Sequence, residues 1–511
     1  MKPEPKRVKF KLNGREIEAA EGSLVIDAAR EQGVEIPHYC YHPALGNPGN
    51  CRLCIVDVEG APKPMVSCRL PVKEGLAVRS DTEAVKRAQA SSLELHLINH
   101  PLDCPVCDQA GECGLQDFYM KFGRYESQMR EDKLHKRKRT VIGPHVVLDQ
   151  ERCVLCTRCT RFTEQVSETH ELGIFGRGHK EYIDLAPGKR LDNPYSGNVI
   201  DICPVGALTE LDFRFKVRVW YLDMTDSVCP NCARGCSISV HANTKRPWHN
   251  DGRRVARIKP RYNPQVNGYW LCDEGRFGFK HLDENRLGRV MRLKSPRKEF
   301  GWDAALGEIA GEIRRLSGDR GGKGLAVIAS GALSNKDWTA FKGLFVDTLK
   351  VKHFLFGPEP DQIGEQDELL RRREKVPNLQ GGEALGFGGS IKSESWESLA
   401  REIESDRIWG LYIVDRDAAQ VWGERGRKLW DRLSLVVYQG IHKDKSSELA
   451  HYRLPATAYV EEEGHFTNFE GVVQGYRKAL EPVGQARPDW MIFSALREKL
   501  AGFPVSEAAL S

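Results

Sequence analysis

Cysteine placement constrains this chain more than any other feature of its sequence. All fifteen cysteines of the 511 residues lie between Cys40 and Cys272. Disulfide pairs cannot use up an odd number, whereas one added histidine completes four sets of four ligands. The four groups, called first to fourth below, are Cys40, Cys51, Cys54 and Cys68; His100, Cys104, Cys107 and Cys113; Cys153, Cys156, Cys159 and Cys203; and Cys229, Cys232, Cys236 and Cys272. Thiolates grouped in this way bind soft metal centres, and the spacings favour iron–sulfur clusters.

Composition limits where such a chain can work. The length leaves room for roughly three to five domains, and no apolar run approaches the ~20 residues that cross a bilayer. The N-terminus carries charge but no apolar signal-peptide core, and thiols kept for metal favour the reducing cytoplasm. The formal charge of +5 is small, and the one dense basic run, residues 133–139, is better explained as a solvated or partner-facing segment than as a nucleic-acid site.

The first group falls in a segment that we expect to form a β-grasp domain. Residues 8–12 and 15–19 alternate apolar and polar side chains around Asn13-Gly14, which predicts a hairpin. Ser23 is a candidate N-cap for a helix over residues 24–32, and Cys68 is expected on a following strand. A C-x-x-C pair with distant partners resembles the plant-type 2Fe–2S pattern, and a zinc site is the alternative.

The second group depends on His100. A helix is predicted over residues 82–99 and stopped by Pro101, so His100 alone would be an ordinary helix-end residue. The three cysteines that follow at once lack a fourth ligand, which favours His100 as that ligand. Imidazole in place of thiolate removes a negative charge and should raise the reduction potential of a cluster.

The third and fourth groups differ in how specific their spacing is. C-x-x-C-x-x-C at residues 153–159 with Cys203-Pro204 is typical of bacterial 4Fe–4S ferredoxins, and zinc competes poorly there. Thr163 occupies the place where a two-cluster ferredoxin has its fourth cysteine, so Cys203 must close the third site. The fourth group leaves zinc open as an alternative on spacing alone. Small residues beside the ligands are expected to bring backbone N–H groups to the sulfurs, namely Gly111, Gly114, Ala233 and Gly235.

These motifs together resemble the family of the large iron–sulfur subunit (the G subunit) of bacterial NADH:quinone oxidoreductase, respiratory complex I. The resemblance is dense over residues ~8–280, and three segments carry it most clearly: 100–113, 196–209 and 271–277. It implies one 2Fe–2S cluster in the first group and a 4Fe–4S cluster in each of the others. The fourth group resembles the cluster domain of molybdopterin oxidoreductases. Only some bacterial members of the complex I family keep this domain, and in them its cluster is regarded as lying off the main electron path.

The resemblance also implies a role. Electrons from NADH, split singly by flavin in a neighbouring subunit, would enter near the first group, pass to the third and then the second, and leave toward quinone, with proton translocation in the whole complex. Expected partners are the flavin/NADH-binding subunit, a 2Fe–2S subunit and the quinone-proximal iron–sulfur subunits, with membrane association only through partners on the inner face of the bacterial plasma membrane. The chain has no convincing nicotinamide, flavin or Walker fingerprint, so alone it should not oxidise NADH.

The C-terminal part, free of cysteine after Cys272, is predicted to be α/β. Helices are expected at 303–316 and 335–349, and strands at 324–330, 352–356, 408–414 and 433–438, an alternation that favours a parallel sheet. Residues 461–474 resemble a segment of the molybdopterin oxidoreductases, whose catalytic portion is much longer, so a truncated scaffold domain is expected. The glycine-rich stretch 381–389 lacks the order of a phosphate-binding loop and is predicted to be a flexible loop.

The predicted fold is therefore multidomain α+β. Its expected domains are a 2Fe–2S ferredoxin-like domain (1–80), a 4Fe–4S region (81–220), a molybdopterin-oxidoreductase-type 4Fe–4S domain (221–280) and a truncated α/β domain (281–511). An electron-transfer subunit of an NAD-linked hydrogenase or a formate dehydrogenase is the alternative function, but no cysteines remain for an iron-only hydrogenase centre and the long catalytic domain is missing. A zinc-stabilised interaction protein is the alternative of another class.

Overall fold

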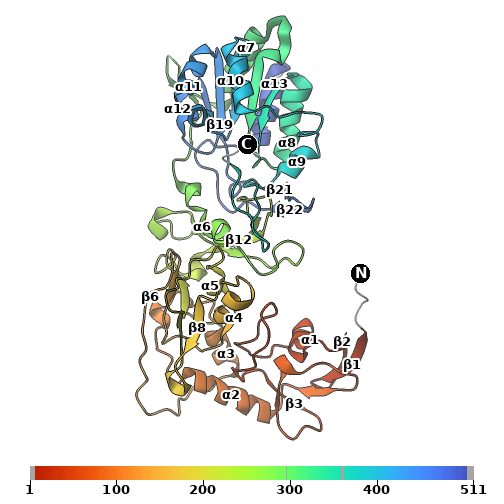
Figure 1. The fold of residues 1–511 in the computed structure, drawn as a ribbon, viewed down its shortest axis with the longest axis vertical. Helices are drawn as coiled ribbons and strands as arrows, with labels where there is room; N and C mark the ends of the chain where they lie inside the picture. Colours follow the sequence, from red (N-terminus) through yellow and green to blue (C-terminus); the bar gives the residue numbers. More distant parts are fainter. Residues whose placement is uncertain (1–5, 295, 358–361, 503–511) are drawn as a thin grey trace. The chain divides into compact units, whose positions relative to one another are not determined.

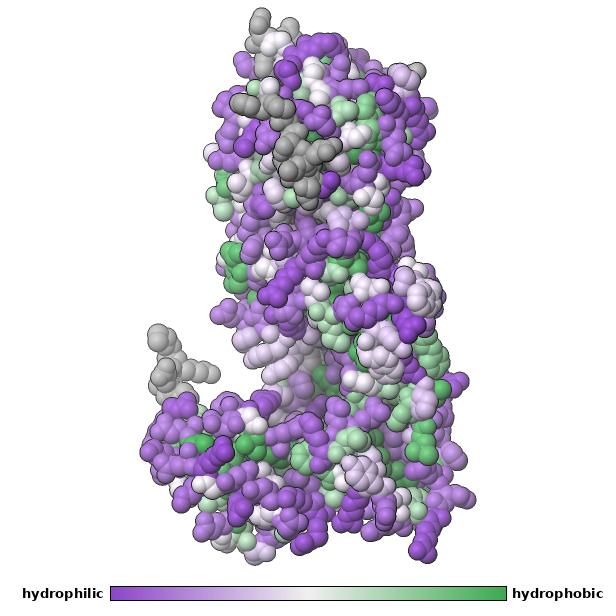
Figure 2. Space-filling model, turned by 180° about the vertical axis from the view of Figure 1, so that it is seen from behind, coloured by the Kyte–Doolittle hydropathy of each residue, from purple (hydrophilic) through white to green (hydrophobic). Residues whose placement is uncertain are grey.

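The computed structural model describes residues 6–294, 296–357 and 362–502, and it divides into two compact units, residues 1–221 and 222–511. Each unit is described by itself. In the described residues, no helix has both the length and the apolar character needed to cross a bilayer. On the face shown in Figure 2 the surface is mainly hydrophilic with scattered apolar patches, as the mean hydropathy of −0.48 leads one to expect.

The first unit opens with the predicted β-grasp domain. Strands β1 (Arg7–Leu12) and β2 (Arg15–Ala20) pair antiparallel around Asn13-Gly14, and the sheet order is β2-β1-β5-β3-β4. Helix α1 (Val25–Glu31) packs on the sheet through its buried residues Val25, Ile26, Ala28 and Ala29, which join Val8, Phe10 and Leu12 in one core. The remaining elements of this domain are β3 (Ile55–Val58), β4 (Met65–Val66) and β5 (Ala77–Arg79).

Two local predictions in this domain are wrong. Helix α1 has Leu24 at its N-cap with no side-chain hydrogen bond, because the Ser23 hydroxyl instead donates to the Ala20 carbonyl. Cys68 lies on a short 3₁₀ turn, Ser67–Arg69, directly after β4 and not on a strand. The turn brings Cys68 back to Cys54, because the Ser67 amide and hydroxyl both donate to the Cys54 carbonyl, at 2.9 and 3.0 Å.

The rest of the first unit is built from short elements joined by long loops. Thr82 caps helix α2 (Glu83–Leu97) by accepting from the Val85 amide, close to the predicted helix 82–99. Small sheets β10-β7-β6 and β8-β9 frame the ligand loops. The bounds are α3 (Gly114–Phe122), β6 (Thr140–Val141), β7 (Val146–Leu148), α4 (Arg158–Gln165), β8 (Leu172–Phe175), β9 (Tyr182–Leu185), α5 (Asn198–Ile202) and β10 (Leu208–Glu210).

The second unit begins with a three-stranded antiparallel sheet that carries the fourth group. Its order is β11-β12-β13, with β11 (Asp223–Val228), β12 (Ser237–Ala242) and β13 (Val255–Pro260). Cys229 and Cys236 lie at the β11–β12 connection, where the Cys229 amide donates to the Cys236 carbonyl at 2.8 Å. Helix α6 (Asp273–Phe277) starts from Cys272.

A seven-stranded sheet forms the rest of the second unit, in the order β15-β14-β20-β19-β18-β16-β17. The five strands from β20 to β17 are parallel; four of them match the predicted strands, whereas β20 and the antiparallel edge strands β14 and β15 were not predicted. The strand bounds are β14 (Met291–Arg292), β15 (Lys298–Glu299), β16 (Leu325–Ala329), β17 (His353–Phe356), β18 (Gly410–Val414), β19 (Leu435–Gly440) and β20 (Tyr452–Pro455).

Helices cover both faces of this sheet (Figure 1). Alternate strand residues divide between two cores: Val327 and Tyr412 face helices α7, α8 and α13, whereas Ile328 and Ile413 face α10 and α11. Apolar side chains that alternate on fully buried strands are what a sheet covered on both faces requires. The helix bounds are α7 (Trp302–Ser317), α8 (Asn335–Phe341), α10 (Trp396–Glu404), α11 (Ala418–Arg432), α12 (Lys445–Leu449) and α13 (Asp489–Leu500).

Two further predictions in this unit are corrected. The helix predicted over 335–349 is α-helical only to Phe341 and continues as a π-helix over Lys342–Thr348. The glycine-rich stretch is helical at its start, where α9 (Leu379–Glu383) packs Gly382 against the Trp338 ring, and only the part around Gly386 and Gly388 turns as a loop. Residues 461–474 contribute to a hairpin of β21 (Gly464–Thr467) and β22 (Val473–Tyr476).

Candidate iron–sulfur sites

The first group brings its four cysteines within interaction range of one another. All four cysteines are buried and none forms a disulfide. Interactions among the four thiols lower the pKa of Cys40 and Cys54 and raise the pKa of Cys51 and Cys68. The Tyr39 amide donates to the Cys51 sulfur at 3.5 Å. Four sulfurs within mutual reach match the ligand set of a 2Fe–2S cluster.

The loop of the first group depends on unusual backbone angles. Gly49 has φ +68°, and an added Cβ there would lie 2.8 Å from Cδ of Arg69. Arg52, between Cys51 and Cys54, also has a positive φ of 54°. A non-glycine residue in this region is strained, and such residues concentrate at functional sites.

The second group lines a cavity of about 520 Å³ together with Arg152 and Gly206. Cys107 and Cys113 are buried and Cys104 is exposed. Desolvation, and next the nearby Arg152 charge, lower the pKa of His100 to about 4. The imidazole is therefore neutral near pH 7, the state in which histidine binds metal.

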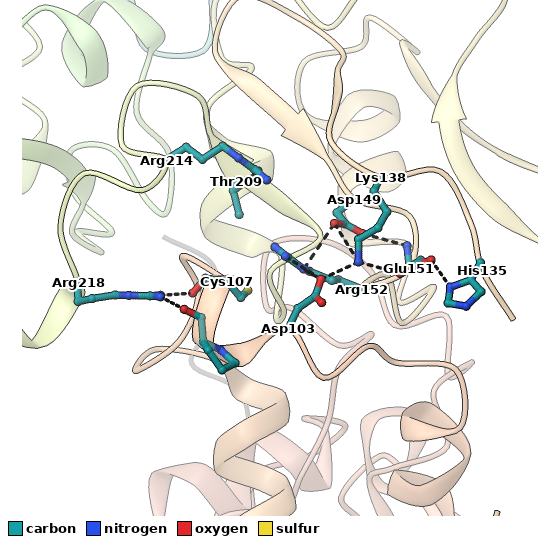
Figure 3. Close-up of polar contacts among 11 residues, drawn as sticks. Asp103, Cys107, His135, Lys138, Asp149, Glu151, Arg152, Thr209, Arg214 and Arg218 are labelled. Carbon is teal, nitrogen blue, oxygen red and sulfur yellow. Dashed lines mark hydrogen bonds and ion pairs between the residues drawn. The ribbon is translucent and has the colours of Figure 1, made fainter. Parts of the chain in front are cut away.

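A charged network lies on one side of Cys107, in the second group (Figure 3). Asp103, next to Cys104, accepts from Arg152 Nη2 at 2.9 Å and from Lys138 Nζ at 2.7 Å. Lys138 also pairs with Glu151 at 2.7 Å, and Arg152 Nε lies 3.5 Å from Asp149. The network ties the loop that precedes Cys153 to the loop that carries Cys104.

The loop that closes the third group also reaches the second. The Pro204 carbonyl accepts from the Gly114 amide at 2.9 Å, next to Cys113. Gly206 lies so close to Cys107 that an added Cβ would be 2.1 Å from its sulfur. On the other side of this site, Arg218 Nη1 donates to the Cys107 carbonyl at 2.7 Å (Figure 3). Gly206 was not among the predicted site residues, although it stands in the Cys-Pro-Val-Gly segment.

The third group surrounds a small apolar cavity of about 20 Å³, lined by all four cysteines with Leu148, Ile183 and Leu208 among the apolar residues. Burial raises the pKa of Cys153 and Cys203 to about 12, and it also raises the pKa of Cys159 well above its ordinary value. Metal binding to such thiols releases protons, because the ligand is the thiolate.

Backbone strain shapes the third group as well. Leu155 and Thr157, between its cysteines, have φ of 52° and 62°. These angles turn the Leu155 amide onto the Cys153 sulfur at 3.4 Å. An amide donor stabilises the anionic sulfur.

The fourth group is buried throughout and lies wholly within the second unit. The Gly275 amide donates to the Cys272 sulfur at 3.3 Å, and a Cβ on Gly275 would lie 3.0 Å from the Cys229 sulfur. Burial raises the pKa of Cys272 to about 12, and it also raises the pKa values of Cys229 and Cys236 well above their ordinary value.

The predicted amide donors are wrong in detail. The Gly111 amide donates to the Gln116 side chain, Gly114 to Pro204, Ala233 to Glu374 and Gly235 to Cys232, all through oxygen acceptors. The sulfurs instead accept from Tyr39, Leu155 and Gly275.

In the described part of the chain, no three His, Cys, Asp or Glu side chains converge as a site for a single metal ion.

Comparison with known proteins agrees with this arrangement. Five family models match in order, and they describe an iron–sulfur protein with ferredoxin-type and molybdopterin-oxidoreductase-type domains. They are the 2Fe-2S iron-sulfur cluster binding domain (5–83), the NADH-ubiquinone oxidoreductase-G iron-sulfur binding region (89–128), the ferredoxin-like domain of NADH-quinone oxidoreductase subunit 3 (143–209), the molybdopterin oxidoreductase Fe4S4 domain (222–284) and molybdopterin oxidoreductase (378–499).

Full-length relatives then define the family. The G subunit of NADH-quinone oxidoreductase from Rickettsia conorii is 31% identical over 97% of this chain and 87% of its own length. The mitochondrial NADH-ubiquinone oxidoreductase 78 kDa subunit of Candida albicans is 32% identical over 96% of this chain and 82% of its own. The chain belongs to the family of NADH-quinone oxidoreductase G subunits, which confirms the resemblance and the interpretation as an electron-transfer iron–sulfur subunit.

Among solved structures, an NAD⁺-reducing [NiFe]-hydrogenase in the H₂-reduced state has a chain that is 32% identical, with a TM-score of 0.38, and the match covers 42% of this chain and 91% of that one.

Proposed function

We propose that the sixteen predicted ligands hold four clusters, a 2Fe–2S cluster in the first group and a 4Fe–4S cluster in each of the other three. When bound, such clusters exchange single electrons. The protein supplies thiolates and one neutral imidazole, amide donors to sulfur, and sites in which thirteen of the fifteen cysteines are buried, Cys153 is partly buried and Cys104 is exposed.

The order of three sites in the first unit supports a relay. Arg161 donates to the carbonyls of Cys40, in the first group, and Cys156, in the third, at 3.5 Å for the latter. The Pro204–Gly206 segment then joins the third group to the second. This adjacency of first, third and second is the observation that carries the proposal, because one-electron transfer requires closely spaced centres. The fourth group, in the other unit, is proposed to stand outside this series.

The wider assembly is proposed from the family. The chain would receive electrons from a flavin-carrying, NADH-oxidising subunit, with a 2Fe–2S subunit alongside, and pass them to quinone-proximal iron–sulfur subunits. It would lie on the inner face of the bacterial plasma membrane and reach the membrane only through those partners. The C-terminal α/β domain is proposed to be a truncated scaffold.

Iron and acid-labile sulfide analysis, combined with low-temperature EPR of the anaerobically reduced chain, tests the proposal. We expect about fourteen iron atoms per chain, one 2Fe–2S signal and several 4Fe–4S signals. About ten irons would mean that one 4Fe–4S group is empty or binds another metal. Zinc in place of iron, with no EPR signal, would contradict the electron-transfer proposal.

A further inference from the structure

Arg161 is a buried cation at the junction of the first and third groups. It lies on α4, two residues after Cys159, and only 8% of it is exposed. Its guanidinium reaches the loop that follows Cys40, which is 115 to 121 residues away in sequence. No signal in the sequence marks this residue apart from its position beside a cysteine motif.

The guanidinium has a complete set of neutral acceptors. Nη1 donates to the carbonyls of Leu45 at 2.5 Å and Gly46 at 2.6 Å. Nη2 donates to Cys40 and Cys156, and Nε to the Thr157 hydroxyl at 3.2 Å. Five N–H groups thus meet five neutral oxygens, so hydrogen bonding is satisfied while the positive charge is not neutralised.

Within the described residues, no carboxylate pairs with Arg161. The neighbouring Arg158 likewise donates to neutral acceptors, the carbonyls of Ile202 at 3.1 Å and Tyr41 at 2.5 Å. A buried charge is costly unless an opposite charge compensates it. The compensating charge available here is that of the two cysteine groups.

We propose that Arg161 is the shared counter-ion of the first and third sites, one guanidinium that holds a ligand loop of each and raises both reduction potentials together. The inference rests on the proposed ligand sets. The negative charge of four thiolates exceeds the net positive charge of the iron–sulfide core that they bind. Both sites are therefore anionic when filled, and reduction makes them more so. A fixed cation between them stabilises the added electron on either side. In the step concerned, one electron leaves the reduced site and enters the oxidised one, and no covalent bond is made or broken.

The test is an EPR redox titration of the full chain, purified anaerobically with its clusters, as wild type, R161Q, R161K and R158Q. In R161Q, we expect the potentials of both the 2Fe–2S signal and the third-site 4Fe–4S signal to fall by about 59 mV or more, a tenfold change in each one-electron equilibrium. R161K keeps the charge and should restore most of both shifts. R158Q removes a nearby charge that contacts no ligand carbonyl, and should lower the 2Fe–2S potential less than R161Q does.

Other results overturn the proposal. Unchanged potentials in R161Q, or a shift at one site alone, would mean that Arg161 only holds the two ligand loops together by hydrogen bonds. If R161Q does not retain both clusters, the potentials of R161K provide the test. Potentials in R161K equal to those of the wild type support the shared counter-ion. Potentials that are lower in R161K, although the charge is retained, contradict it. A wild-type chain without these two EPR signals would overturn the proposed function itself, and that result is obtained before any variant is compared.

Discussion

The cysteine-bearing loops of the first unit and the seven-stranded sheet of the second are stabilised in different ways. In the sheet, β16, β18 and β19 are buried throughout, and their side chains pack alternately into two apolar cores. Between residues 100 and 221, no α-helix or strand exceeds the nine residues of α3 in the described structure, and left-handed residues hold the ligand loops. The sheet is stabilised by burial of apolar side chains, whereas the loops are expected to be stabilised by the clusters that they bind.

Iron removal is expected to give the largest difference in amide exchange between the two regions. Anaerobic chelation is expected to speed amide exchange at residues 104–113 and 153–159 by about 100-fold or more, because metal–thiolate bonds supply folding free energy there. Exchange in β16, β18 and β19 should stay within about twofold of the intact protein, since that core contains no ligand. Hydrogen exchange with mass spectrometry measures both. Equal loss of protection in the sheet would remove the distinction.

Phe341→Ala should have the converse effect. Phe341 is fully buried in the core between the sheet and α13, with ring centroids 4.8 Å from Phe345 and 5.6 Å from Phe493. Truncation should cost about 3–5 kcal/mol in the free energy of unfolding of the second unit. Denaturant titration measures this loss, and the EPR signals of the first three groups should be unchanged. The half-exposed Val421→Ala is the control, with an expected change below about 0.5 kcal/mol.

Gly206→Ala should damage one site and spare the sheet. The added Cβ would stand 2.1 Å from the Cys107 sulfur, too close to be relieved without moving either the Cys203 loop or the ligand. We expect loss of about four irons and of the second-site EPR signal, with overpacking strain of about 1–3 kcal/mol. Gly307→Ala on α7 is the matched control, because nothing lies within 4 Å of its Cβ position. A G206A chain with full iron content and all EPR signals would show that the contact between residue 206 and Cys107 can relax to accommodate the added methyl group.

The difference between the two regions also explains how far sequence reasoning reached. Alternating strands and helices predicted the parallel sheet, because each strand carries its own burial pattern, but the two-residue edge strands β14 and β15 have too few residues to show one. The cysteine spacing predicts the four ligand groups because ligands must come in complete sets, and this assignment stays a prediction. Arg161 and Gly206 escaped prediction because their roles depend on contacts with loops about 100 residues away, Cys40 and Cys107 respectively.

The smallest expected effect is a pH-dependent one in the sheet region. His353, at the start of β17, pairs with Glu394 at 2.7 Å; this hydrogen bond raises the pKa of His353 above 6.5 and lowers that of Glu394 below 4.5. The His353 contribution is complete below pH 6.5 and is lost as the pH rises through the raised pKa. The Glu394 contribution is complete above pH 4.5 and is lost as the pH falls through the lowered one.

His353→Gln should therefore lower the melting temperature of the second unit at pH 5.5 and lower it less at pH 8.5. The difference corresponds to less than about 1 kcal/mol, as for other partly exposed ion pairs. Calorimetry at the two pH values measures it, with the exposed His465→Gln on β21 as the control that should show no such difference. An equal loss at both pH values would assign His353 to packing alone. Iron content should not change in either variant, because this pair belongs to the region that is specified by burial.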